Sequence, residues 1–450
     1  MRVFVTGGTG HTGSYIIPEL IAAGHEVTGL ARSDTAAAAV SALGAKVRRG
    51  DLGDLGDLDG LMGAAADSDG VIHVAHRQDL LPFGGMDAVS AAELPVMLAY
   101  GEALAGTGKP LVAAGSIGSS GNMGRPATEE DPDLPVGDEH KGTLRVRNVV
   151  ETAVIDLAER GVRSSVVRIA LIAHSTTDRA GFLPILIALA KEKGFAGYPG
   201  DGANLWSAVH ARDVASLFRL ALEKGAAGRY WHAVGDEGIA LREIAEAIGS
   251  HLDLPAVSIP ADELMVPGYF GLLANIVTQS YPASSLITRQ TLGWEPAQPG
   301  LLADLDNGHY FPASSSVRDA NDVPELSTEK IAQVVRSYIE LAGHGSAAGH
   351  RSADEVAALF ADNAIFESPV GGDAHRGIEA IRSAYHSIWD GREQRVGLVS
   401  LNVAGGEAAV HVQVVHSGQR IDVIDVMTFD EDAKISSLRT YFGPSNVVTL

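Results

Sequence analysis

The feature that most constrains the fold is a glycine-rich loop close to the start of the chain. The short apolar run Val3–Thr6 leads directly into the sequence TGGTGHTG, and a segment with helical spacing, Gly13–Ala23, follows. Glycines at positions 7, 10 and 13 allow a tight turn, close approach of the backbone to a pyrophosphate, and close packing of helix on strand. The helix N-terminus offers N–H groups to the phosphates. The loop therefore predicts a dinucleotide site, whose expected cofactor-binding residues are Thr6, Gly7, Thr9, Gly10, His11, Thr12 and Gly13.

The end of the second predicted strand, Glu26–Leu30, indicates which dinucleotide binds. An Asp or Glu there would bind the ribose of NAD, whereas this chain continues with Ala31, Arg32 and Ser33. An arginine suits a 2′-phosphate, so the sequence favours NADP(H) over NAD(H). The alternative is an arginine that meets only solvent. The adenine and its ribose are expected beside residues that follow the third and fourth strands, namely Asp51, Leu52 and Ala75.

Strand and helix patterns alternate from residue 1 to residue 311. Further predicted strands are Lys46–Arg49, Val71–Ala75, Pro110–Ala114 and Ser165–Ile169, and later helices are Phe182–Glu192 and Asp213–Lys224. Such alternation is typical of an α/β fold with a doubly wound parallel sheet, the Rossmann architecture. The alternation loosens after about residue 170, where we expect an irregular lobe on the substrate side.

A second domain is expected after a polar, proline-bounded stretch at residues 312–326, which we interpret as a linker. In residues 327–450, two helical segments, Ser327–Leu341 and Ser352–Phe360, precede several strands of period two. Turn signals separate these strands at Ala404–Gly406, Ser417–Gly418 and Asp430–Asp432. Helices followed by a run of antiparallel strands indicate an α+β domain.

Composition narrows the partners and the compartment. The formal net charge of −22 disfavours nucleic acid and anionic membranes as partners, and a hydrophobic content of 46% excludes wholesale disorder. The sequence has no cysteine, which removes disulfides, thiolate metal sites and cysteine nucleophiles, and we expect no metal. Without an apolar run long enough for a membrane span or a signal peptide, a cytoplasmic protein is expected. The sequence also allows a homodimer.

Motifs in the first 311 residues resemble the extended or atypical short-chain dehydrogenases/reductases. They are TGGTGHTG, GDL at Gly50–Leu52, VIHVAH at Val71–His76, VHARDVA at Val209–Ala215 and LGWEP at Leu292–Pro296. The resemblance covers Met1–Phe311 and implies hydride transfer with a Ser or Thr, a Tyr, and a Lys four residues after the Tyr. In that family the Tyr is the general acid/base, and the Lys lowers the pKa of the Tyr and holds the nicotinamide ribose.

The chain departs from this family pattern where the tyrosine and lysine belong. On the expected helix Gly142–Glu151, Thr143 takes the tyrosine position and Arg147 the lysine position, while Ser116 matches the serine. A threonine hydroxyl is a far weaker acid than a phenol, and arginine is effectively never deprotonated. Arg147 could still hold the ribose, and Ser116 could bind a carbonyl oxygen. The stretch Asp138–Lys141 offers replacement acids or is a solvated charge cluster.

A carboxyl group on an apolar strand face is the main signal of the second domain. In the predicted strand Ile421–Phe429, alternation places Asp425 on one face with four large apolar side chains. A carboxyl there is costly unless it is protonated or paired. The alternative is an edge strand whose aspartate meets water.

Three segments of this domain resemble ketosteroid isomerase, within the nuclear transport factor 2-like fold that polyketide cyclases share. They are SYIEL at Ser337–Leu341, FADNAIFESPVGG at Phe360–Gly372 and IDVIDVMTFDEDAKI at Ile421–Ile435. The resemblance implies a cone-shaped, curved-sheet α+β domain around a cavity. It also implies that Tyr338 and Asp425 donate hydrogen bonds to an oxyanion, with Tyr385 supporting Tyr338 and with the acid kept neutral by its apolar site, as is known for that isomerase.

The general base of the isomerase is missing from this chain. Ser368 stands in its position, and a serine cannot serve as a carboxylate base near neutral pH. Its neighbour Glu367 should point to the opposite face of an extended strand. Asp373 and His375 could reach in only if their loop folds over the cavity mouth. We therefore expect enols and phenols to bind and isomerisation to be slow, unless Asp373 or His375 acts as the base.

Together the two halves predict a bifunctional NADP(H)-dependent oxidoreductase fused to an isomerase-like domain, acting on a polycyclic ketone or alcohol of steroid or polyketide type. Oxidation of a 3β-hydroxy-5-ene steroid followed by double-bond migration would use both domains in sequence. One alternative is a non-redox isomerase, cyclase or dehydratase whose first domain only binds the cofactor. Another is a ligand-binding or sensor protein.

Overall fold

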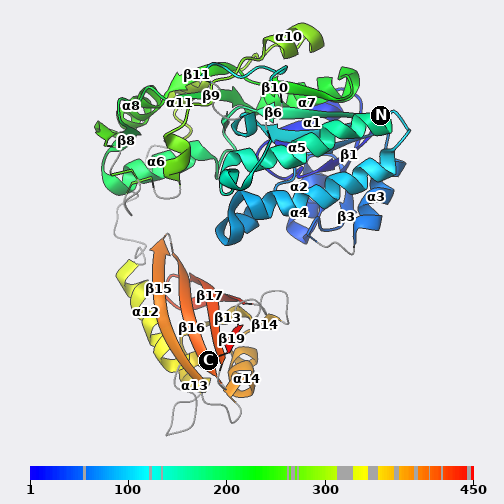
Figure 1. The fold of residues 1–450 in the computed structure, drawn as a ribbon. Coiled ribbons are helices and arrows are strands. Elements are labelled where there is room, and N and C mark those ends of the chain that lie inside the picture. The colour runs from blue at the N-terminus through cyan, green and yellow to red at the C-terminus, as the bar shows by residue number, and fades with distance from the viewer. Residues whose placement is uncertain are drawn as a thin grey trace. The chain divides into compact units, whose positions relative to one another are not determined.

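The computed structural model divides into two compact units, Met1–Ser314 and Ser315–Leu450, each of which is described by itself (Figure 1). The described residues are 1–53, 57–120, 124–132, 135–260, 263–264, 269–270, 273–311, 328–342, 353–368, 374–389, 394–404, 406–416, 419–442 and 447–449. The stretch predicted as a linker, residues 312–326, lies outside them.

The first unit is built on a seven-stranded parallel sheet in the order β10-β6-β5-β4-β1-β2-β3. Its strands are β1 (Arg2–Thr6), β2 (Glu26–Ala31), β3 (Lys46–Arg49), β4 (Gly70–His73), β5 (Pro110–Ser116), β6 (Arg163–Ile169) and β10 (Arg229–Ala233). The predicted doubly wound sheet is confirmed. The strand order reverses between β1 and β4, and ligands of such sheets bind at the carboxyl ends of the strands at this point.

Helices cover both faces of this sheet because its strands are apolar on both sides. Along β1, Val3 and Val5 enter one hydrophobic core and Phe4 enters another. The first core includes residues of α1 (Gly13–Ala22), α2 (Asp34–Ala42) and α7 (Ala211–Lys224), and the second those of α3 (Leu58–Asp67), α4 (Leu81–Leu104) and α5 (Asn148–Asp156). Short 3₁₀ helices lie at Gln78–Leu80, Ile117–Ser120, Asp138–His140, Leu144–Arg147 and Leu157–Arg160. Among the helices that the structure describes in either unit, none combines the length and apolar character needed to cross a bilayer.

A smaller lobe follows β6, as the loosened alternation predicts. It contains the sheets β11-β9-β7 and β12-β8. Their strands are β7 (Ile172–His174), β8 (Ala196–Pro199), β9 (Leu205–His210), β11 (Asp236–Ala240) and β12 (Ala256–Ile259), and the helices are α6 (Phe182–Lys193), α8 (Leu241–Leu252), α9 (Ala274–Val277) and α11 (Leu301–Asp306). The helix α10 (Leu286–Leu292) lies instead against β10 and α7. Because β7 and β9 are parallel and pair His174 with His210, both strands end at the same point.

The second unit has the predicted α+β class. Its sheet runs β14-β13-β18-β17-β16-β15, with β19 beside β17, and every described pair is antiparallel except β13 with β18. The strands are β13 (Phe360–Glu367), β14 (Ala374–Arg376), β15 (Gln394–Ala404), β16 (Glu407–His416), β17 (Gln419–Phe429), β18 (Ile435–Tyr441) and β19 (Val447–Thr449). Apolar residues of α12 (Thr328–Ala342), α13 (Ala353–Ala357) and α14 (Ile378–Trp389) complete one core with these strands.

The predicted helix Ser352–Phe360 is wrong at its end. The helix α13 stops at Ala357, and Phe360 begins β13, where it pairs with Ile435 of β18. The carbonyl of Leu359 already accepts from the amide of Ile435, so the sheet takes the chain out of the helix. The predicted turn at Asp430–Asp432 is observed, whereas Gly405 and Ser417–Gly418 lie outside the described residues.

Candidate functional site

The glycine loop lies against the end of β4 and leaves no room for side chains. Gly7 has a φ of +75°, and a Cβ there would lie 2.5 Å from the backbone nitrogen of Ala75. A Cβ on Gly13 would lie 2.1 Å from the carbonyl oxygen of Gly7, and the amide of Gly10 donates to that oxygen at 3.0 Å. Thr12 directly precedes α1, and its side chain makes no capping hydrogen bond within the described part of the chain. The loop backbone and helix start thus fit a pyrophosphate.

Thr6 and His11, two of the residues predicted to bind the cofactor, also make side-chain contacts that hold the fold together. The buried hydroxyl of Thr6 lies 2.8 Å from Nδ1 of His73, which ties β1 to β4. His11 places Nε2 2.7 Å from Oγ of Ser175, just beyond β7, and burial lowers the pKa of His11. Thr9 is exposed at the tip of the loop. His11 therefore connects the glycine loop to the smaller lobe.

The residues predicted for the adenosine side lie at the ends of β2, β3 and β4. Arg32, directly after β2, is exposed. Ser33 Oγ accepts a hydrogen bond from the amide of Ala36 at 3.2 Å, so it caps α2. Asp51 Oδ1 accepts from the amide of Gly53 at 2.9 Å, while half-buried Leu52 packs on the second core. The structure brings these residues to the sheet edge that carries the glycine loop.

Ser116 and Thr143 differ in their surroundings. Ser116 ends β5 and is half-buried, and its Oγ accepts from the amide of Gly118 at 3.0 Å. Thr143 is exposed and donates to the carbonyl of His140 at 2.7 Å. The expected single helix over Gly142–Glu151 is wrong, because Thr143 is extended (φ −104°, ψ 163°) and precedes a 3₁₀ turn. The α-helix α5 begins only at Asn148.

Arg147 is held in a buried network that the sequence did not predict. Its guanidinium donates to both carboxylate oxygens of Glu93, at 3.0 and 3.2 Å, and to the carbonyl of Ala114 at 3.2 Å. Burial alone would raise the pKa of Glu93, but Arg147, His76 and His73 outweigh it and hold that pKa at about 2. Arg147 thus fastens α4 of the fold to the end of β5.

The same guanidinium fixes the proton of His76. Arg147 Nη1 lies 3.0 Å from Nδ1 of His76. Because arginine only donates, Nδ1 must accept, and the proton of a neutral His76 is assigned to Nε2. His76 follows Ala75, which packs against Gly7, so this donor lies next to the glycine loop.

A second buried network supports Ser116 from behind. Glu151 Oε1 accepts from the amide of Ser116 at 3.0 Å and from the hydroxyl of Ser119 at 2.7 Å. Its other oxygen accepts from Nε of Arg168 at 2.7 Å, and Arg168 also donates to Asn148 at 3.0 Å. In the stretch Asp138–Lys141, exposed Lys141 and Asp138 pair at 2.8 Å, as expected of the solvated charge cluster and not of a replacement acid.

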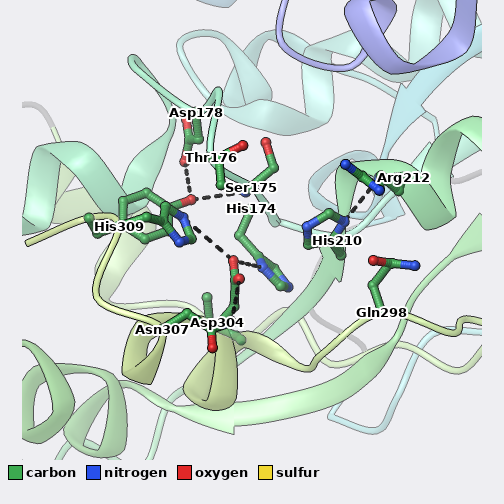
Figure 2. A network of polar contacts seen from close by, with 12 residues as sticks. His174, Ser175, Thr176, Asp178, His210, Arg212, Gln298, Asp304, Asn307 and His309 are labelled. Carbon is green, nitrogen blue, oxygen red and sulfur yellow. Dashed lines mark hydrogen bonds and ion pairs between the residues drawn. The ribbon is translucent and has the colours of Figure 1, made fainter. Parts of the chain in front are cut away.

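A further polar network lies where β7 and β9 end (Figure 2). His174, which is wholly buried, places Nδ1 2.7 Å from Oδ2 of Asp304, and the imidazole of His309 lies 3.7 Å from the same oxygen. Burial opposes ionisation of Asp304, but the two histidines lower its pKa. The Nε2 of His174 has no hydrogen-bond partner in the described part of the chain, and Figure 2 shows it turned toward the side where His210 and Gln298 lie.

This network is joined to the glycine loop. Tyr310 donates to Asp178 at 3.1 Å and accepts from the amide of Ser175 at 3.1 Å, and Ser175 in turn contacts His11. An aspartate that holds Nδ1–H leaves Nε2 of His174 as a proton acceptor. The VHARDVA motif contains His210, but His174 and Asp304 are 130 positions apart, and no local pattern pairs them.

In the second unit, Asp425 is buried on the face that the alternation predicts. Val423, Asp425 and Met427 are buried, whereas the residues between them are half-buried. Asp425 is 4% exposed, and its Oδ1 has no hydrogen-bond partner among the described residues. Burial raises the pKa of this carboxyl to about 6, against the opposing hydrogen bond from Thr440.

Tyr338 and Tyr385 complete this buried polar group. Their hydroxyls lie 2.8 Å apart, and both side chains are buried. Burial, the neighbouring Tyr385 and Asp425 raise the pKa of Tyr338 well above its usual value. Burial likewise raises the pKa of Tyr385. The two tyrosines therefore keep their protons at neutral pH, Asp425 keeps its proton below about pH 6, and in that state all three can donate hydrogen bonds to a bound oxygen.

The side chains near the position of the missing base, on β13, directly after it and on β14, lie in different surroundings. Glu367 Oε2 accepts from Nε of Arg439 at 3.3 Å, which engages it away from the aromatic core. Ser368 is half-buried directly after the strand, and Asp373 lies outside the described residues. His375 on β14 lies directly opposite Phe366, and the two rings are stacked. Within the part of the chain that the structure describes, no cluster of residues fits a metal ion.

Comparison with protein families gives two matches. Residues 3–233 match the NAD dependent epimerase/dehydratase family, and residues 336–438 match the SnoaL-like domain. An uncharacterised protein of Schizosaccharomyces pombe is 40% identical over 313 residues, which is 69% of this chain and all of that protein. The steroid Δ-isomerase of Nocardioides simplex is 35% identical over 127 residues, 27% of this chain and 97% of that enzyme.

Solved structures show the same fold in the first unit. The UDP-glucose 4-epimerase of Thermotoga maritima, solved with UDP-glucose, superposes with a TM-score of 0.55 at 19% identity, over 69% of this chain and 98% of that one. A dTDP-glucose 4,6-dehydratase of Streptomyces venezuelae, solved with NAD, gives a TM-score of 0.54 at 19% identity, over 68% of this chain and 97% of that one. At these identities the likeness concerns the fold alone.

Proposed function

The chain belongs to the NAD dependent epimerase/dehydratase family and carries a SnoaL-like domain after it, and on this premise we propose an NADP(H)-dependent oxidoreductase that acts on a polycyclic ketone or alcohol. In this proposal the second domain binds the same compound and moves its double bond. The relative that covers the second domain is named a steroid Δ-isomerase, which supports a steroid-like substrate.

The observation that carries the proposal is that Oδ1 of Asp425 is buried without a hydrogen-bond partner among the residues that the structure describes. A buried polar atom without a partner costs about 1–3 kcal/mol, so the site gains when a ligand supplies the partner. Protonated Asp425 and Tyr338 both donate, and Tyr385 supports Tyr338 from 2.8 Å. Preorganised donors of this kind stabilise an enolate or phenolate oxygen in apolar surroundings. A polycycle with one ketone or phenol oxygen matches both the donors and the apolar residues around them.

The first domain fits a dinucleotide, which would exchange a hydride with the substrate carbon when bound. The loop from Gly7 to Gly13 would hold the pyrophosphate, and exposed Arg32 would pair with a 2′-phosphate. Ser116 Oγ accepts from Gly118 and keeps its own proton for a substrate oxygen. Nε2–H of His76 is a second donor at this edge, beside Arg147.

A non-redox function is the second candidate, and a specific observation favours it. The two positions that should move protons hold an exposed threonine, Thr143, and a buried arginine, Arg147, that is already paired with Glu93. In this case the first domain binds the cofactor without turnover. The isomerisation, cyclisation or dehydration would then occur in the second domain alone, or the protein would only bind and sense its ligands.

Turnover by the full chain separates these functions. With NADP⁺ and a 3β-hydroxy-5-ene steroid, the proposal expects reduced cofactor and conjugated enone to form together, both followed by ultraviolet absorbance. With NADPH, a panel of polycyclic ketones and aromatic polyketides tests the reverse direction. Enone formation from a 5-ene-3-ketosteroid without any cofactor turnover would support the non-redox function. If neither reaction occurs and the protein still binds phenolic steroids, it is a ligand-binding protein.

A further inference from the structure

We propose that His375 is the base that moves the proton in the second domain, in place of the carboxylate that Ser368 replaces. The inference rests on the proposed function of this domain and names the residue that would complete it.

The register of β14 turns the imidazole toward the core. His375 pairs directly with Phe366 of β13, and residues directly opposite in antiparallel strands share a face. Phe366 is 3% exposed and belongs to the core. The two rings are stacked, with centroids 5.9 Å apart and planes at 28°. The neighbours Ala374 and Arg376 are exposed, whereas His375 is half-buried, as this orientation requires.

A ladder of rings connects His375 to the oxyanion donors. Phe366 stacks on Tyr385 with centroids 5.2 Å apart and planes at 13°, and the Tyr385 hydroxyl lies 2.8 Å from that of Tyr338. A flat polycycle whose oxygen is held by Tyr338 and Asp425 extends along this ladder toward His375. The donors then hold the ketone oxygen, and His375 acts on the carbons next to the ketone along the ladder.

Other groups near β14 are engaged or face elsewhere. Glu367 pairs with Arg439, and Arg382 of α14 pairs with Asp354 and Glu379. The titratable or charged residues on the elements packed against β14 are Asp362 and Glu367 on β13 and Glu379, Arg382, Tyr385 and His386 on α14, with Arg376 on β14 itself. Burial raises the pKa of Tyr385, which excludes it as a base.

The step balances without an added reactant. The unprotonated imidazole nitrogen of His375 takes a proton from the carbon between the ketone and the isolated double bond. The C–H electron pair forms a dienolate whose oxygen accepts hydrogen bonds from Tyr338 and Asp425. The imidazolium then returns the proton to the far end of the former double bond, which yields the conjugated enone and neutral histidine.

The test compares isomerisation with binding in the full chain. We measure conversion of a 5-ene-3-ketosteroid by enone absorbance and binding of a phenolic steroid by fluorescence titration. His375→Gln should slow isomerisation by about 10²-fold or more, since positioned general bases contribute about 10²–10⁴-fold. It should leave phenol binding within about twofold, which also shows that the variant is folded. His386→Gln on α14, an exposed histidine, is the matched control and should change neither quantity.

Recovery of isomerisation by a second substitution distinguishes a catalytic base at position 375 from a histidine ring that only supports the fold. In the His375→Gln background, Ser368→Asp should restore a large part of the lost rate, because it returns a carboxylate to the position that the general base of the isomerase occupies. Unchanged isomerisation in His375→Gln, or phenol binding by a parent protein that does not isomerise, would overturn the assignment of His375. A parent protein that does not bind the phenolic steroid would overturn the proposed function of the domain as well.

Discussion

Arg147 of the first unit and Asp425 of the second are both buried, ionisable groups of a family motif, but they differ in how far their polar atoms are paired. Arg147 in the first unit is fully engaged by Glu93, His76 and the carbonyl of Ala114. Asp425 in the second unit keeps one oxygen without a partner among the described residues. Native proteins satisfy nearly all buried polar groups, so an exception calls for a ligand, whereas a satisfied pair needs none. Their positions in family motifs alone would make Arg147 and Asp425 equally good candidates for ligand-binding residues.

Removing Arg147 tests the scaffold side of this comparison and should have the largest effect. Arg147→Met leaves Glu93 ionised and buried, and breaking such a pair costs about 3–5 kcal/mol of unfolding free energy. Trp206, Trp231 and Trp294 are buried in the first unit, so tryptophan fluorescence in urea follows its unfolding. Arg32→Met removes an exposed arginine and serves as the control with no change. A stability loss below about 1 kcal/mol for Arg147→Met would show that the pair is not the anchor described above.

The ligand side is tested by the pH dependence of stability. The pKa of Asp425 is raised from 3.8 to about 6 in the folded protein, so the folded state binds the proton more tightly than the unfolded state. The second unit should be most stable below pH 3.8 and lose about 3 kcal/mol as the pH rises through about 6. Hydrogen exchange of the amides in β16 to β18 measures this, and Asp425→Asn should remove this contribution. A slope of the opposite sign would mean that the carboxyl is paired.

Cofactor preference tests whether an exposed charge can also be a ligand-binding group. Arg32→Asp should weaken NADP(H) binding by about ten- to a hundredfold and favour NAD(H), because a charged hydrogen bond contributes about 1.5–3 kcal/mol. Fluorescence titration of both cofactors with the parent protein and the variant gives the ratio. Arg179, on the smaller lobe, provides an Arg→Asp control of equal charge change. Equal affinity of the parent protein for both cofactors would contradict the assignment of Arg32.

The smallest effect is expected at Thr143. Its hydroxyl is exposed and already bonded to the carbonyl of His140, so Thr143→Ala should change ketone reduction by about twofold or less. Ser116→Ala removes the donor at the end of β5 and should lower kcat/KM more. Steady-state kinetics with one ketone and NADPH compares the two. A loss of several orders of magnitude at Thr143 would make it a catalytic residue.

The sequence predicts what local periodicity encodes. The strand Lys46–Arg49 has the predicted bounds, and the buried set around Asp425 follows the predicted alternation. The pairing of Arg147 with Glu93 joins residues 54 positions apart, and no helix or strand period relates them. The end of α13 was missed because Phe360 is drawn into β13 by Ile435, a contact 75 positions along the chain. Contacts between residues far apart in the sequence decide which buried polar groups have hydrogen-bond partners. The sequence therefore identifies candidate site residues but does not show which of them remain available to a ligand.

The forked guanidinium of Arg147 also sets a condition for anyone who wishes to engineer a conventional reductase from this chain. Introducing the family's tyrosine and lysine at positions 143 and 147 exchanges a planar, five-donor group for a single ammonium. That ammonium cannot reproduce both bonds to Glu93 together with those to His76 and Ala114. The exchange would leave some of the acceptors on Glu93, His76 and Ala114 without a hydrogen-bond donor, next to the glycine loop. A workable redesign has to change Glu93 and His76 in the same step, because these side chains satisfy the hydrogen bonds of Arg147 and depend on it in turn.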